Sequence, residues 1–99
     1  MNTRPVLLSI HPRFVDAIAG GTKTIELRRR FPNLAPGTLV AIYATTPRAE
    51  MTLVARVANI DRAPPTQLWP RVEHGAGVSR HEFDTYFLGA AMGAAVSLT

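Results

Sequence analysis

Hydrophobic and polar positions along the chain recur with two different periods, and each change of period marks the start of an expected element. Apolar residues at every second position predict strands, and a spacing near 3.6 predicts helices. We therefore expect five strands, at residues 6–10, 24–30, 38–45, 51–60 and 94–98. We also expect two or three short helices: residues 12–19, a short segment from Thr66, and a segment from Ser79 to Gly89.

Some of these segments carry more detailed expectations. The run at 6–10 is interpreted as a buried strand, and the run at 38–45, apolar on both faces, as a central strand. Pro70 should cut short the helix that begins near Thr66, because proline has no backbone N–H to donate. Residues 61–65 should break the chain, and residues 75–77 are interpreted as a flexible linker.

A capping box gives the sharpest local prediction. In Ser79-x-x-Glu82 the hydroxyl of the serine accepts from the N–H of the third helical residue, and the carboxylate of the glutamate accepts from the N–H of the serine. Phe83, Tyr86 and Phe87 then form the apolar stripe of the helix. Glu82 therefore has a structural task that competes with any catalytic one.

Length and element order bound the architecture. Ninety-nine residues suffice for one core and are too few for two, so a single domain over residues 1–99 is expected. Five strands with two or three flanking helices and no strand–helix–strand rhythm indicate the α+β class, as a mixed, strongly bent sheet or small β-barrel.

Composition narrows the setting in which the protein acts. No apolar run reaches the ~18 residues of a membrane helix, and the N-terminus lacks the long apolar region of a signal peptide. Cysteine is absent, which excludes disulfides and thiol chemistry. We expect a cytoplasmic protein without a membrane partner.

The positive charge is concentrated in the first half of the chain. Residues 1–50 carry seven Lys or Arg against three acidic residues, a net +4, whereas residues 51–99 carry four of each. Lys23 is the single lysine, and arginine suits forked contacts with phosphate and stacking on bases. A GC-rich genome would also favour arginine codons, but it does not explain the difference between the halves.

The stretch from Gly21 to Arg30 concentrates the candidate chemistry. Strand periodicity puts Glu26, Arg28 and Arg30 on the face opposite to the apolar residues. Lys23 close to a carboxylate could serve as a phosphate clamp, a general acid or an activated amine, and the spacing does not decide between them. The alternative is a self-neutralised ion pair on a solvated face.

Other kinds of site find no support in the sequence. His11, His74 and His81 lack the HxxxH or HxH spacing of a metal site, so no metal is expected. No GxSxG elbow, Walker A loop or dinucleotide fingerprint is present, so we expect no cofactor. The stretch around Lys23 is therefore the leading candidate.

The same stretch carries a family resemblance. Residues 21–28 match the GxKxxExR signature of ASCH domains, which are small relatives of the PUA and EVE folds. The resemblance continues in order through residues 8–12, 40–45, 68–69, 77–83 and 86–89. The chain resembles the group described as predicted regulators with a PUA-like domain. This implies a five- or six-stranded barrel with flanking helices, in a fold whose members bind RNA or hold a modified base in a pocket.

The chain departs from the family pattern at its C-terminus. Relatives usually continue beyond the final strand into a segment that helps to close the barrel, and an aromatic residue usual in that strand is replaced within Gly93-Ala94-Ala95. We therefore expect an incompletely closed barrel. Uncovered strand edges tend to pair with other chains, which predicts a homodimer or closure by a partner.

The leading functional hypothesis is a regulatory domain that binds RNA or a nucleotide-like small molecule in a basic cleft around the second strand. In this hypothesis Lys23, Arg28 and Arg30 contact phosphate, and Glu26 orients Arg28 or accepts a hydrogen bond from a base edge. The remaining pocket lining is expected to be Ser9, His11, Tyr43 and Thr45. An interaction module that pairs through an open sheet edge is a further alternative.

The rival hypothesis is a hydrolase, either a single-strand ribonuclease or an amidohydrolase of acylated cytidine. Lys23 and Glu26 would then form its acid–base pair. In ASCH amidohydrolases the lysine works with a threonine three residues later, and Glu26 stands at that position, so the hydroxyl is missing. We expect Glu26 to hold Lys23 protonated, which suits a phosphate clamp better than a nucleophile.

Overall fold

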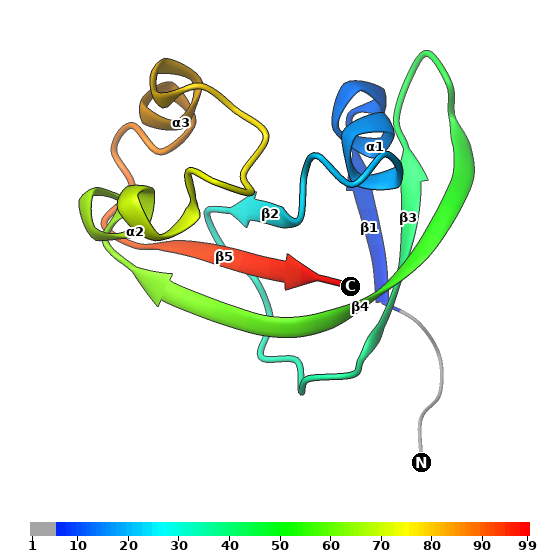
Figure 1. Ribbon diagram of the computed structural model, residues 1–99, viewed down its shortest axis with the longest axis horizontal. Helices are drawn as coiled ribbons and strands as arrows, with labels where there is room; N and C mark the ends of the chain where they lie inside the picture. The colour runs from blue at the N-terminus through cyan, green and yellow to red at the C-terminus, as the bar shows by residue number, and fades with distance from the viewer. Residues whose placement is uncertain (1–5) are drawn as a thin grey trace.

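One five-stranded sheet, curled into a half-barrel, organises the computed structural model, which describes residues 6–99 (Figure 1). The elements follow in the order β1 (Val6–Ile10), α1 (Pro12–Ala19), β2 (Ile25–Arg28), β3 (Leu39–Ala44), β4 (Glu50–Ala63), α2 (Pro65–Val72), α3 (Arg80–Tyr86) and β5 (Gly93–Leu98). Over these residues, the helices are too short or too polar for any of them to span a bilayer.

The strand order is β1-β3-β4-β5-β2. β1 runs parallel to β3 and the other neighbours are antiparallel, so the predicted mixed sheet is confirmed. β3 lies between β1 and β4, as its two apolar faces predicted. The long strand β4 pairs with β3 through its first half and with β5 through its second. An irregularity between Val57 and Asn59 falls near this change of partner, and such irregularities bend a strand.

The half-barrel is open on one side. β1 and β2 are the terminal strands of the sheet and do not pair with each other in the part of the chain that the structure describes. The expectation of incomplete closure is thus confirmed. As a terminal strand β1 buries only Leu8 and Ile10, so the prediction of a buried first strand was half correct.

Two hydrophobic cores fill the concave side of the sheet, one under α1 and the other under α2 and α3 (Figure 1). The first contains Val15 of α1 with Val40 and Ile42 of β3. The second contains Leu68 of α2 and Phe83 of α3. Each such side chain contributes ~1.5–3 kcal/mol when fully buried. Both cores pack on the curved surface of β4 and β5, and each is covered by its own helices.

Local sequence signals explain where two helices begin. The ring nitrogen Nδ1 of His11 accepts from Arg13 N at 3.1 Å, which caps α1 ahead of Pro12. The predicted capping box of α3 is confirmed, with Glu82 N donating to Ser79 Oγ at 3.1 Å and Ser79 N donating to Glu82 Oε1 at 3.0 Å.

Two predicted interruptions of the chain are absent, and β2 ends at Arg28, two residues before its predicted end. α2 continues through Pro70 to Val72, because proline removes a single hydrogen bond and the burial of Leu68 and Val72 holds the remaining turn. β4 continues to Ala63 through the expected break at 61–65, because its last residues pair with the first residues of β5.

Candidate functional site

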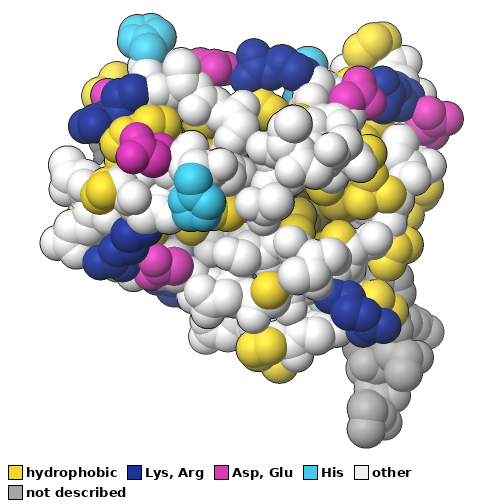
Figure 2. Space-filling model, in the orientation of Figure 1, with side chains coloured by type: hydrophobic (Ala, Val, Ile, Leu, Met, Phe, Trp, Pro, Cys, Tyr) yellow, Lys and Arg dark blue, Asp and Glu magenta, His cyan; other side chains and the backbone are white. Residues whose placement is uncertain are grey.

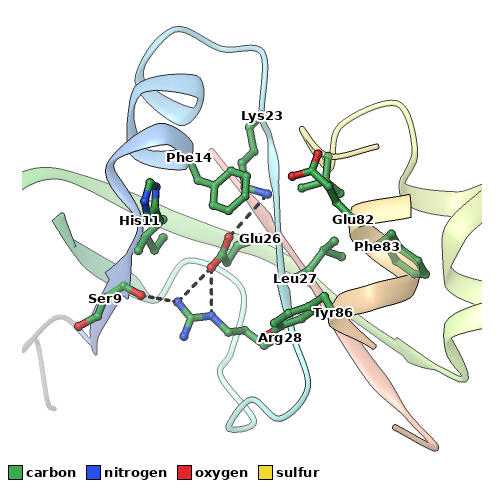
Figure 3. Close-up of a pocket in the computed structure, with 12 residues that line it drawn as sticks. Ser9, His11, Phe14, Lys23, Glu26, Leu27, Arg28, Glu82, Phe83 and Tyr86 are labelled. Atoms are coloured by element: carbon green, nitrogen blue, oxygen red, sulfur yellow. Dashed lines mark hydrogen bonds and ion pairs between the residues drawn. The ribbon is translucent and has the colours of Figure 1, made fainter. Parts of the chain in front are cut away.

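A cavity of about 320 Å³ opens between the two cores, beside the open side of the half-barrel (Figure 3). Three segments far apart in sequence form its walls: the end of β1 with α1, the Lys23–β2 segment, and the α3 region. The lining residues are Ser9, Ile10, His11, Phe14, Lys23, Glu26, Leu27, Arg28, Val78, Glu82, Phe83 and Tyr86.

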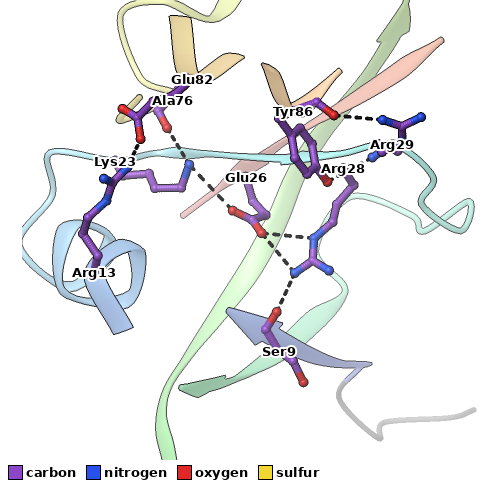
Figure 4. A network of polar contacts seen from close by, with 9 residues as sticks. All are labelled: Ser9, Arg13, Lys23, Glu26, Arg28, Arg29, Ala76, Glu82 and Tyr86. Atoms are coloured by element: carbon purple, nitrogen blue, oxygen red, sulfur yellow. Dashed lines mark hydrogen bonds and ion pairs between the residues drawn. The ribbon is translucent and has the colours of Figure 1, made fainter. Parts of the chain in front are cut away.

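A row of charges lies at the base of this cavity (Figures 3 and 4). Within residues 6–99, Lys23 and Glu26 are the buried charged residues, with 2% and 7% of their surface exposed. Glu26 Oε1 lies 3.6 Å from Lys23 Nζ, and Glu26 Oε2 lies 3.0 Å from both Nε and Nη2 of Arg28. Burying charges costs free energy that pairing seldom repays, so such a row in a cavity marks a candidate functional site.

The side chain of Lys23 is fixed by contacts with several elements. Its Nζ donates to the carbonyl oxygen of Ala76 and lies 4.9 Å from the centre of the Phe14 ring. Burial lowers the pKa of Lys23, and the nearby carboxylate of Glu26 opposes this shift without cancelling it. As expected, Glu26 favours the protonated form of Lys23, but desolvation of the ammonium has the larger effect, so the net shift of the pKa is downward.

The loop at residues 75–77 is a packed wall and not the flexible linker expected from its glycines. The carbonyl oxygen of Gly75 accepts from Thr24 N at 2.9 Å and from Ile25 N at 3.0 Å, which ties the loop to the start of β2. Ala76 is fully buried. Gly77 has a φ of +68°, and a Cβ there would lie 3.0 Å from Cβ of Lys23. The loop therefore fixes the stem of Lys23 in place.

Arg28 bridges the open side of the half-barrel. Its Nη2 donates to the carbonyl oxygen of Ser9 on β1 at 3.0 Å, while Nε is bonded to Glu26 (Figure 4). The side chain is 26% exposed, so it is the cation of the row that remains open to a ligand.

Glu82 joins the cavity from α3. Its carboxylate caps the helix and also forms an ion pair with Arg13, whose guanidinium lowers the pKa of Glu82. The lining thus contains two cations, Lys23 and Arg28, against the carboxylates of Glu26 and Glu82. The cavity itself is balanced in charge and not basic as expected.

The structure brings five of the eight predicted binding residues together at this cavity: Ser9, His11, Lys23, Glu26 and Arg28. The other three do not line it. Arg30 is exposed and follows the end of β2, and Tyr43 faces away from the buried Ile42 and Ala44 of its strand. Thr45 begins a turn, in which its carbonyl oxygen accepts from Arg48 and Ala49. These three were placed by extending strand periodicity past the strand ends or onto the wrong face.

Sequence reasoning missed several lining residues. Phe14, Val78 and Tyr86 line the cavity, although Tyr86 was assigned only to the hydrophobic stripe of its helix and the other two to no site. A signal existed for Tyr86, because an amphipathic tyrosine is often placed where one end is apolar and the other wet. Its hydroxyl accepts from Arg29 N at 3.3 Å.

Over the described chain, no cluster of three or more His, Asp or Glu side chains is arranged to hold a metal ion. The polar side chains that line the cavity carry amine, guanidinium, carboxylate, imidazole, hydroxyl and phenol groups.

Comparison with known proteins agrees with this geometry. The ASCH domain family matches residues 8–94. The chain belongs to the ASCH domain family. A curated protein of Zymomonas mobilis called an ASCH domain-containing ribonuclease is 34% identical over 86 residues, which cover 87% of this chain and 58% of that protein. The chain thus spans little more than half of this relative's length.

Solved structures of other proteins have the same fold. The crystal structure of the ASCH protein from Zymomonas mobilis is 32% identical, with a TM-score of 0.92 over 99% of this chain and 68% of that one. A protein from Enterococcus faecalis is 12% identical, with a TM-score of 0.70 over 99% of this chain and 76% of that one, and supports the fold alone.

Proposed function

We propose that this ASCH domain binds single-stranded RNA and takes one base, or a nucleotide-like small molecule, into the cavity between its two cores. The observation that carries the proposal is the buried row Lys23–Glu26–Arg28 at the base of that cavity. The name of the Zymomonas mobilis relative, a ribonuclease, supports RNA as the ligand class.

The size and walls of the cavity suit a base. A volume of about 320 Å³ is at the small end of ligand pockets. Phe14 and Tyr86 supply aromatic surface on opposite walls, and unstacked RNA bases are commonly held on aromatic rings. Unpaired bases of single strands can enter such a pocket, whereas bases within a duplex cannot without being extruded.

The polar groups suit a base edge inside and phosphate at the mouth. Glu26 Oε1 is 3.6 Å from Lys23 Nζ, too long for a good hydrogen bond, so this oxygen can accept from an amino group of a base. Arg28 can offer its remaining N–H groups to a carbonyl or phosphate oxygen. Because the lining is balanced in charge, phosphate contacts belong to the rim and not to the interior.

The test is the affinity for a labelled single-stranded RNA, measured by fluorescence anisotropy at several salt concentrations. We expect Arg28→Gln to weaken binding by ~10-fold or more, the size of a lost charge-assisted contact. Arg71→Gln is the matched control, because Arg71 is also paired with a carboxylate, Asp61, at 3.1 Å, but does not line the cavity. Equal losses in the two variants would contradict the proposal.

A second candidate function is cleavage of the bound RNA, favoured by the name of the 34% identical relative. In that case a base removes the proton of the 2′-hydroxyl as it attacks phosphorus, and an acid gives a proton to the departing 5′-oxygen. Lys23 and Glu26 remain the proposed pair, although both are held by partners that make turnover slow. A cleavage assay with Lys23→Ala and Glu26→Gln decides: loss of cleavage with binding retained supports it.

We also propose that the domain acts in the cytoplasm as a homodimer. The open edges of β1 and β2 favour pairing with another chain. Leu7 and Val54, each 60% exposed, lie in register on the outer face of β1, β3 and β4. Figure 2 shows hydrophobic side chains gathered toward the right of the view. Light scattering tests the proposal: we expect a dimer that Val54→Glu dissociates, and a monomeric wild type would contradict it.

A further inference from the structure

A second ion pair crosses the mouth of the cavity outside the buried row (Figure 4). Nη2 of Arg13, at the start of α1, donates to Oε2 of Glu82 on α3. Both side chains are exposed, by 56% and 42%. Since α1 packs on the first core and α3 on the second, the pair connects the two walls between which a ligand would enter.

The two oxygens of Glu82 have separate tasks. Oε1 accepts from Ser79 N at 3.0 Å and caps α3, whereas Oε2 accepts from Arg13. Releasing Arg13 therefore leaves the capping box intact, and α3 does not lose its N-terminal cap. Exposed ion pairs of this kind contribute little to stability, so a competing anion can replace one partner.

Arg13 is positioned to meet such an anion. Its guanidinium lies 4.4 Å from the centre of the Phe14 ring, and that ring lines the cavity. The stacking holds the guanidinium at the mouth whether or not Glu82 is bound to it. A guanidinium binds a phosphate group through the same forked hydrogen bonds that it gives a carboxylate.

We propose that Arg13 is a phosphate-binding residue of this cleft and that Glu82 occupies it in the free protein, so that an RNA phosphate replaces the carboxylate on binding. The inference rests on the proposed function and adds its regulation: Glu82 competes with RNA and sets the affinity. In the free protein Glu82 neutralises Arg13, so Arg13 presents its positive charge to the ligand only when it exchanges partners.

Glu82→Gln separates the two tasks of Glu82, because glutamine also completes a capping box but carries no charge. We expect this variant to bind labelled single-stranded RNA ~5-fold more tightly at low salt. The slope of log affinity against log salt should steepen by up to ~0.7, the value for one phosphate on a single strand. In wild type the displaced carboxylate of Glu82 takes up a counterion, which offsets one of the counterions released from the RNA. Glutamine takes up none, so the slope is steeper. Arg13→Gln should bind more weakly than wild type, and adding Glu82→Gln to it should bring no further tightening.

Asp84→Asn is the matched control. Asp84 is also on α3, is 56% exposed and pairs with Arg80 at 3.1 Å, so the variant removes one charge and frees one arginine away from the cavity. Circular dichroism of each variant would check that α3 is retained. If Glu82→Gln tightens binding no more than Asp84→Asn does, Glu82 does not compete with RNA for Arg13 and the inference is wrong. The proposed function would still stand in that case if Arg28→Gln weakens binding. If neither wild type nor Glu82→Gln binds RNA, the proposed function fails and this inference with it.

Discussion

The position of Lys23 depends on the absence of a side chain at Gly77. A Cβ added there would lie 3.0 Å from Cβ, 3.1 Å from Cγ and 3.2 Å from Cδ of Lys23. These atoms belong to the stem of the lysine and not to its flexible end. They cannot move aside easily, because Nζ is bonded to the carbonyl oxygen of Ala76. Gly77→Ala is therefore expected to disturb the base of the cavity directly.

The expected loss of stability has two parts. A φ of +68° costs an L-residue ~1–2 kcal/mol, and forcing a methyl group into a packed site costs a further ~1–3 kcal/mol. Gly77→Ala should therefore lower the free energy of unfolding by ~2–5 kcal/mol. The measurement is urea denaturation followed by circular dichroism, with linear extrapolation to water.

Gly37→Ala isolates the part that comes from backbone conformation. Gly37 has a φ of +90°, and a Cβ there would meet nothing within 4 Å. This control should lose only the ~1–2 kcal/mol that comes from backbone conformation. The difference between the variants measures the close approach to Lys23. If both variants lose the same free energy, the packing of this loop against Lys23 is not as described and the reasoning is refuted.

Two further predictions concern ionisation and capping. Because burial lowers the pKa of Lys23 below its ordinary 10.5, the unfolded chain binds more protons than the folded chain between the lowered pKa and 10.5. The free energy of unfolding of wild type should thus rise with pH through that window relative to Lys23→Met, and parallel pH profiles in denaturant titrations would speak against a buried ammonium. Ser79→Ala removes the hydroxyl that caps α3 and should cost ~1 kcal/mol in the same assay, whereas an unchanged stability would mean that the capping box contributes nothing.

Much of the fold could be predicted from local signals. The alternation around Ile25 and Leu27, the capping box of α3 and the doubly apolar run of β3 each depend on near neighbours in the sequence, and each was confirmed. The failures depend on distant partners. β4 extends beyond its expected end because its last residues pair with residues 93–95 of β5, about thirty residues later in the sequence.

The site was predictable as a segment but not as a cavity. The GxKxxExR signature identified Lys23, Glu26 and Arg28, because a single short stretch carries all three. Phe14 and Tyr86 come from helices on different cores, so no local pattern could show that they line the same cavity. The downward shift of the Lys23 pKa could not be predicted for the same reason: Glu26 is a sequence neighbour, whereas the 75–77 loop that helps to bury Lys23 is distant in sequence.

The central claim is that RNA enters the cavity between the two cores, and mapping of backbone amide signals by nuclear magnetic resonance tests it most directly. A short single-stranded RNA would be added to ¹⁵N-labelled protein. The account predicts the largest shifts at Ser9, Lys23, Val78 and Tyr86, which line three different walls of the cavity. The second hollow of the molecule, lined by Leu34, Ile60 and Arg62, serves as the internal control. Shifts concentrated at that hollow, with the cavity residues unchanged, would contradict the account.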